Sequence, residues 1–129
     1  MKNGLLRAVT AAMIAFGLLT IASGGLTLFG APSHRQAAGA YVPFVLWFNF
    51  MAGFAYVIAG LGLWLARRWA VLLAVAICVA TLVVFAAFGV HVLNGGAYEM
   101  RTVGAMTLRS LVWAGVAWLA YRRIWLRFA

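Results

Sequence analysis

Five polar residues lie within or beside strongly apolar stretches of this sequence, where side chains able to do chemistry are rare. They are Asn49, Tyr56, His91, Glu99 and Arg109. A polar group inside an apolar helix is costly unless it meets a partner or water, so such residues mark candidate sites. A guanidinium with an imidazole and one carboxylate would suit a small anion, a quinone headgroup or a proton relay. We therefore predict a binding site formed by these five side chains.

Helical spacing supports this grouping. Intervals of three and four place one set of residues on a single stripe of a helix: Glu99, Thr102, Met106, Arg109 and Trp113. A comparable stripe on an earlier segment contains Asn49, Gly53, Tyr56 and Gly60. At about 1.5 Å per residue, Arg109 and Asn49 both lie roughly 12 to 15 Å below the same membrane surface. The carboxylate of Glu99 is within reach of Arg101, of His91, or of Arg109 if the helix bends.

Two other interpretations of these residues stay open at this stage. A buried arginine with one acid and an amide can serve only to fix the register of the helices. A copper site could use imidazole and thioether donors, which favour that metal; the candidates are His34, His91, Glu99, Met100 and Met106. These donors come from different segments without ligand spacing, so we predict no metal site.

Motifs that name a reaction are missing from the sequence. It contains no serine, histidine and acid set, no phosphate-binding loop and no HExxH motif. The single cysteine, Cys78, excludes an intramolecular disulfide. The sequence therefore favours a protein that is not an enzyme, and we predict no catalytic residues.

Composition predicts the elements that position the five polar residues. Of the 129 residues, 67% are hydrophobic and 9% are charged, whereas a soluble domain is about half apolar and a quarter charged. A soluble domain of this size could not bury so much apolar surface. We therefore predict an all-α integral membrane protein, a four-helix bundle surrounded by the lipid bilayer.

Four apolar stretches are long enough for membrane-spanning helices, which need about 20 residues each. We predict one domain with spans at about 8–29, 42–66, 70–93 and 100–121. Pro43 suits the first turn of the second helix, and Asn94-Gly95-Gly96 predicts the end of the third. A basic start before an apolar run also describes a signal peptide, but the first stretch exceeds the usual signal core of about 7 to 15 residues.

Basic residues predict the orientation, because they are retained on the cytoplasmic side. One face would carry Lys2, Arg7, Arg67, Arg68, Arg122, Arg123 and Arg127, and the other Arg35 and Arg101. This asymmetry predicts a multi-pass protein of the inner (plasma) membrane, N-in and C-in, with both termini cytoplasmic. The net charge of +9 then reflects attraction to anionic headgroups, and we expect no binding to nucleic acid.

Small residues recur at helical spacing and predict close packing of the helices. The stripes contain Ala8, Ala12 and Ala15 in the first helix, Gly53 and Gly60 with Ala52, Ala55 and Ala59 in the second, and Ala76 and Ala80 in the third. Such stripes favour a tight bundle, and also association with a second copy or another membrane protein, over a wide pore.

Parts of the sequence resemble a known family of small membrane proteins. The segments are Leu5-Leu6-Arg7, Phe16-Gly17-Leu18-Leu19, Gly24 to Gly30, Ala59 to Trp64, and Arg67-Arg68-Trp69-Ala70 with the alanine-rich helix that closes at His91. Together they are similar to the first three helices of DoxX-like proteins. That resemblance implies four membrane helices and a partner-dependent role, either accessory or in a quinone-linked oxidoreductase. The chain departs from the family near Tyr56, where an acidic residue is usual.

These observations lead to three hypotheses about function. The first is a small inner-membrane accessory protein that packs against a partner or itself, with a polar cluster in the outer half of the bundle. The second is a small transporter or channel subunit for an ion or small solute. The third is a quinone-linked oxidoreductase subunit, in which quinone is the only cofactor that we consider.

Overall fold

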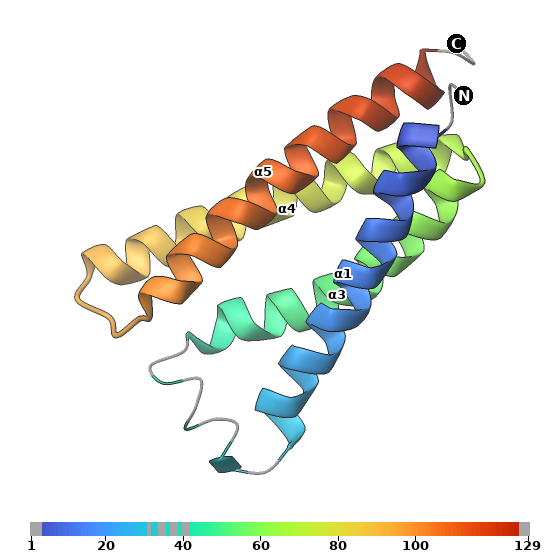
Figure 1. Cartoon of the computed structure of the whole chain (residues 1–129). Helices are drawn as coiled ribbons and strands as arrows, with labels where there is room; N and C mark the ends of the chain where they lie inside the picture. The colour runs from blue at the N-terminus through green and yellow to red at the C-terminus, as the bar shows by residue number, and fades with distance from the viewer. Residues whose placement is uncertain (1–3, 31, 34–35, 37–38, 40–41, 127–129) are drawn as a thin grey trace.

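The structure is a computed structural model and describes residues 4–30, 32–33, 36, 39 and 42–126. Its helices are α1 (Gly4–Phe29), α3 (Pro43–Trp64), α4 (Arg68–Leu93) and α5 (Met100–Ala120), and α5 continues into a π-helical turn, η1 (Tyr121–Trp125) (Figure 1). All four long helices have the length and apolar composition that a membrane span requires. The prediction of an all-α chain with four candidate spans is confirmed.

The ends of the helices follow from local backbone chemistry. Helix α3 begins with Pro43 in its first turn, where the missing N–H leaves no bond unmade. In the short turn before α4, Ala66 adopts a φ of 56° and the N–H of Arg67 donates to the carbonyl of Gly62 at 2.9 Å. Helix α4 ends as its sequence predicts, because Gly95 adopts a φ of +81° and turns the chain back toward α5.

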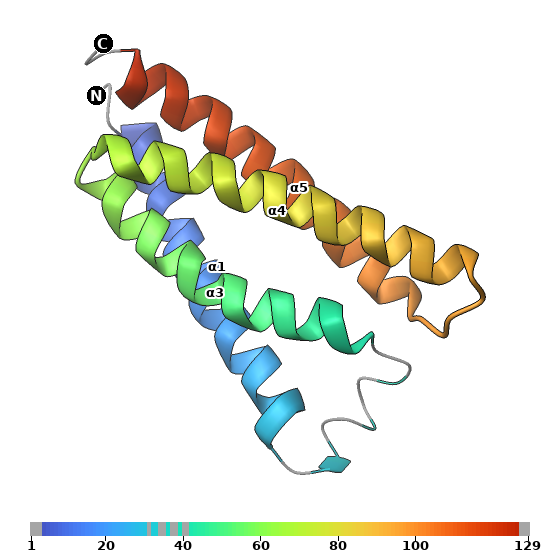
Figure 2. The ribbon, with the colours of Figure 1, turned by 180° about the vertical axis from the view of Figure 1, so that it is seen from behind.

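The four helices form two hairpins that diverge (Figures 1 and 2). Helix α1 packs along α3, α4 packs along α5, and α3 contacts α4, whereas α1 touches α5 only marginally. The end at which α1 begins and η1 finishes is called here the closed end, because the hairpins converge there. At the opposite end, called here the open end, the last turns of α1 stand away from the first turns of α5 (Figure 2).

Glycines bring α1 and α3 together. A Cβ added to Gly17 would lie 2.8 Å from the carbonyl oxygen of Gly53, and one added to Gly53 would lie 2.8 Å from Cγ1 of Ile21. Gly60 is in similarly close contact with Ile14. The predicted close packing at Gly53 and Gly60 is therefore confirmed.

The alanine stripe predicted for the first helix does not pack against another helix of the chain. Ala8, Ala12 and Ala15 are exposed in the structure. Helix α1 instead buries a stripe with a period of three and four residues, formed by Leu6, Thr10, Met13, Gly17, Thr20 and Gly24. The glycines in this stripe allow a closer approach to α3 than alanine would, so they determine which face packs.

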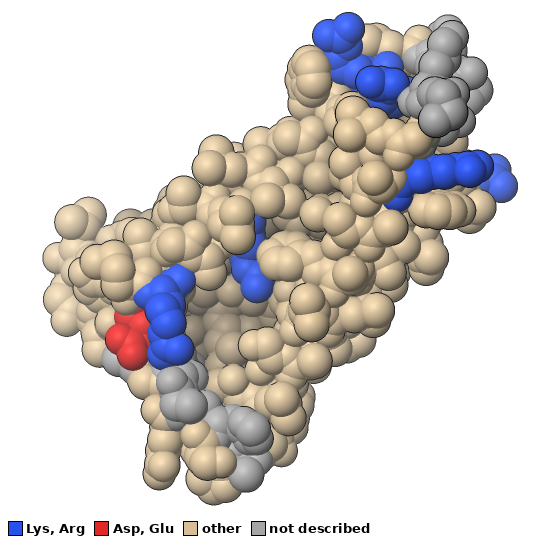
Figure 3. All heavy atoms as spheres, in the orientation of Figure 1, with Lys and Arg blue, Asp and Glu red and all other residues tan. Residues whose placement is uncertain are grey.

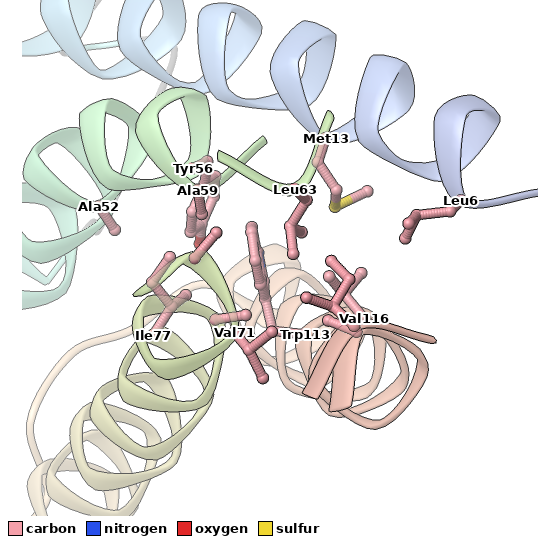
Figure 4. Close-up of a cluster of buried hydrophobic side chains, with 14 residues drawn as sticks. Leu6, Met13, Ala52, Tyr56, Ala59, Leu63, Val71, Ile77, Trp113 and Val116 are labelled. Carbon is pink, nitrogen blue, oxygen red and sulfur yellow. The ribbon is translucent and has the colours of Figure 1, made fainter. Parts of the chain in front are cut away.

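Two clusters of apolar side chains hold the hairpins together. The larger one fills the closed end and the middle of the molecule with side chains from all four helices, and Figure 4 shows Met13, Leu63, Trp113 and Val116 pointing toward one another. The smaller one joins α4 to α3 and α5 at the open end through Val42, Val45, Phe88 and Met106. Neither cluster fills the space between α1 and α5 at the open end.

Candidate functional site

Arg109 lies near the middle of α5 and reaches toward the other hairpin. Its Nη1 donates one hydrogen bond to Oγ1 of Thr20 in α1 at 3.3 Å and one to the hydroxyl of Tyr56 in α3 at 3.2 Å. Tyr56 is fully buried and Thr20 nearly so. One guanidinium thus links three helices at the level where the hairpins begin to diverge.

Aromatic rings form the rest of the surroundings of the guanidinium. Its carbon lies 4.9 Å from the ring centre of Phe16 and 5.8 Å from that of Tyr56. Tyr56 in turn stacks on Phe16, with ring centres 5.6 Å apart, and packs against Trp113 at 4.8 Å. Ring faces attract cations, so these rings favour a charged guanidinium in an apolar setting.

No acidic side chain balances the charge of Arg109. Glu99 is the only Asp or Glu of the sequence, and its Oε1 lies 3.7 Å from Nη2 of Arg101. Glu99 precedes Arg109 by ten residues, which corresponds to roughly 15 Å along a helix. Of the three possible partners of Glu99, the structure therefore shows Arg101 rather than His91 or Arg109.

A cavity of about 220 Å³ opens between α1, α3 and α5 at the open end. Ser23, Thr27, Val42, Val45, Leu46, Asn49, Glu99, Arg101, Thr102 and Ala105 line it. On each helix these residues lie on the open-end side of the Arg109 cluster: beyond Thr20 in α1, before Tyr56 in α3 and before Arg109 in α5. None of Arg109, Thr20 and Tyr56 lines the cavity, but their cluster adjoins it on the side away from the open end, and we call the two together the Arg109 pocket.

Figure 3 gives the corresponding distribution of charge. Basic atoms gather at the closed end, and others lie in a hollow on the face shown. The acidic atoms lie beside basic atoms at the open end (Figure 3), which agrees with the ion pair between Glu99 and Arg101. The hollow is therefore basic in its depth and neutral at its rim.

Three buried polar atoms in this region lack a hydrogen-bond partner among the described residues. They are Oδ1 of Asn49, Nε of Arg109 and Nε1 of Trp113. Such atoms are rare in native proteins, because each loses its hydration without compensation. Their concentration around the Arg109 pocket indicates a site whose polar groups the described chain does not satisfy by itself.

Apolar packing closes the pocket toward the closed end. Trp113 follows Arg109 by one helical turn and is fully buried. Met13, Leu63 and Val116 pack in the same cluster (Figure 4). In the described part of the chain, the pocket is consequently closed on the side that faces the closed end.

The structure does not bring all five predicted site residues together. Tyr56 bonds to Arg109, while Asn49 and Glu99 line the cavity. His91 lies apart from them, because its Nε2 is 2.8 Å from the carbonyl oxygen of Ala97 and its ring packs edge-on against Phe44. It belongs to the turn between α4 and α5 rather than to the pocket.

Thr20 and Phe16 are contacts of Arg109 that the polar residues alone did not predict. Counting back from the end of α1 at Phe29 gives Thr20 a depth of nine residues, close to the depth of Arg109 behind Glu99. Thr20 also belongs to the buried stripe of α1. Its depth from the end of α1 and its place in the helical period would together have identified Thr20 from the sequence.

The metal-site alternative has no support from the arrangement of its donors. His34 lies outside the described residues, and the described chain contains no group of three His, Cys, Asp or Glu side chains placed to hold one ion. Glu99 and Met100 stand at the start of α5, whereas Met106 is buried in the smaller apolar cluster. These donors do not converge.

Comparison with known proteins finds no match for the chain among family models, curated proteins or solved structures.

Proposed function

We propose that this chain is a small accessory protein of the inner membrane that binds a ligand or a partner in the Arg109 pocket. The observation that carries the proposal is Arg109 itself. Its charge lies next to an open cavity, and Glu99, which carries the only acidic side chain of the sequence, is paired with Arg101 instead. Arg109 is half-buried, and a cation in an apolar setting requires compensation, which the bound group would supply.

The orientation belongs to the same proposal. The closed end would face the cytoplasm, since Arg7, Arg67, Arg68, Arg122 and Arg123 gather there and basic residues are retained on that side. Trp64 and Trp125 lie beside these charges, with the Arg7 guanidinium 5.5 Å from one ring and that of Arg68 3.9 Å from the other. Tryptophan with arginine is typical of a membrane interface. The pocket would then open toward the outer side.

The two other hypotheses have weaker support. A transporter or channel subunit needs a polar path to the closed end, where Trp113, Leu63 and Val116 instead form an apolar cluster. A quinone-linked subunit depends on the resemblance to DoxX-like proteins, which we retain as a proposal. The position near Tyr56 that would carry an acid in that family here carries a hydroxyl that accepts a hydrogen bond from Arg109.

Filling the cavity while leaving Arg109 intact tests the proposed function. Ala105 lines the cavity, so Ala105→Trp should exclude the occupant. Ala114 lies on the same helix, is exposed and does not line the cavity, so Ala114→Trp is the matched control. Tagged wild-type, A105W and A114W proteins are purified from native membranes in mild detergent, and their bound polypeptides and extractable small molecules are quantified by mass spectrometry.

We expect one species to be retained by the wild type and by A114W and to be lost from A105W and from Arg109→Gln. If all four proteins retain the same species equally, the pocket is not a binding site. If Arg109→Gln lowers only the thermal stability in detergent and changes no bound species, Arg109 serves to fix helix register and the proposal is wrong.

A further inference from the structure

We infer that the group that meets Arg109 is the carboxylate of a small organic monoanion with an apolar body. This inference rests on the proposed function and specifies its ligand. The charges give the first argument. Arg101 is paired with Glu99 at 3.7 Å, so the Arg109 pocket keeps one uncompensated positive charge. A monoanion neutralises it, whereas a dianion would leave a net negative charge in an apolar setting.

The donors of the guanidinium give the second argument. Within the described chain, every hydrogen bond of Arg109 runs through Nη1, and Nε is buried without a partner. An arginine presents five N–H donors in a planar fork that matches a carboxylate. The hydroxyls of Thr20 and Tyr56 position this fork from one side and leave donors for an incoming oxygen.

The size and lining of the cavity give the third argument. A volume of about 220 Å³ is many times the ~10 to 15 Å³ that one water molecule needs. That is room for a carboxylate with a short chain. From α3 the cavity is lined by Val42, Val45 and Leu46 together with Asn49. The other helices add the hydroxyls of Ser23, Thr27 and Thr102 and the ion pair of Glu99 and Arg101. The apolar body of the ligand would lie against the three aliphatic side chains of α3.

The same chemistry can come from two sources: a water-soluble carboxylic acid that enters from the open end, or a fatty acid dissolved in the bilayer. The marginal contact between α1 and α5 leaves both routes available. The shared prediction is recognition of one carboxylate by Arg109, and the two sources are distinguished by competition.

The test measures binding of radiolabelled hexanoate to the protein in phosphatidylcholine nanodiscs by equilibrium dialysis. Hexanamide has the same shape without the charge and is the ligand control. Loss of a charge-assisted hydrogen bond lowers affinity by at least about tenfold, so we expect hexanamide to compete at least that much more weakly than hexanoate. If the natural ligand is a fatty acid from the bilayer, oleate added to the nanodiscs should displace hexanoate. If oleate does not displace hexanoate, the ligand is a water-soluble acid.

Arg109→Gln should weaken hexanoate binding by at least about tenfold. Arg122→Gln changes the net charge equally but lies at the closed end beside Trp118, and it should leave binding unchanged. Equal binding of hexanoate and hexanamide would overturn the inference even if Arg109→Gln does not fold. If the wild type binds no hexanoate but A105W still loses its bound species, only the inference of a carboxylate ligand is refuted. If A105W retains the same bound species as the wild type, the proposed function is refuted.

Discussion

Gly17→Ala should separate α1 from α3 and thereby disturb the Arg109 pocket, because Thr20 and Tyr56 lie on these two helices. The new Cβ would lie 2.8 Å from the carbonyl oxygen of Gly53, whereas ordinary contacts begin at 3.4 Å. The difference of 0.6 Å must be met by movement of a helix, because a backbone oxygen cannot rotate away. Overpacking of this kind costs about 1 to 3 kcal/mol of unfolding free energy.

The higher helix propensity of alanine opposes this packing cost and must be subtracted before the cost can be measured. Alanine in a helix is more favourable than glycine by up to about 1 kcal/mol. Gly115 in α5 has no atom within 4 Å of an added Cβ, so Gly115→Ala reports the helix term alone. The difference between the two variants isolates the packing cost, and we expect G17A to be less stable than G115A by about 1 to 3 kcal/mol.

The assay is equilibrium unfolding by sodium dodecyl sulfate in dodecylmaltoside micelles, followed by tryptophan fluorescence. Binding of hexanoate should weaken in G17A as well, because Thr20 and Tyr56 lie on the two helices that separate. Their bonds to Arg109, at 3.3 and 3.2 Å, have little room to lengthen. Stability of G17A equal to or above that of G115A would refute the close packing of α1 against α3.

The remaining predictions concern the turn after α4 and the orientation of the chain. His91→Phe removes the 2.8 Å contact with the carbonyl of Ala97 while keeping an aromatic ring beside Phe44. It should lower the free energy of unfolding by about 1 kcal/mol without changing hexanoate binding. A large loss of hexanoate binding would instead place His91 in the binding site. Reporter fusions should put both termini in the cytoplasm, and termini on opposite sides of the membrane would exclude the arrangement of four spans.

The helices were predictable because the length of an apolar run and its end signals are local properties. Gly95 illustrates this, since a single residue with a φ of +81° ends α4 where the sequence indicates. The helix faces that carry Arg109 and Tyr56 also followed from spacing, because residues three and four apart share a helix face. Both predictions needed only local sequence, an end signal for Gly95 and the helical period for the faces.

Side-chain partners across helices were less predictable, because they depend on how the hairpins are placed. His91 bonds within its own turn, since the left-handed Gly95 brings Ala97 back to it. The alanines of α1 face outward because the glycine at position 17 allows closer packing against Gly53. A sequence pattern gives the possible faces of a helix, and close contact selects one of them.

The contacts of Arg109 explain why a charge is tolerated between the two hairpins. Phe16 and Tyr56 offer ring faces, and two hydroxyls accept hydrogen bonds from Nη1 of Arg109, so the chain itself already stabilises the cation in part. An anion that binds only the folded chain adds to this and stabilises the fold in proportion to the logarithm of its concentration. Because Arg109 joins α5 to α1 and α3, the gain would fall on the contact between hairpins. Occupancy of the pocket would then set how firmly the hairpins hold together, which is a property that an accessory protein can use to respond to its ligand.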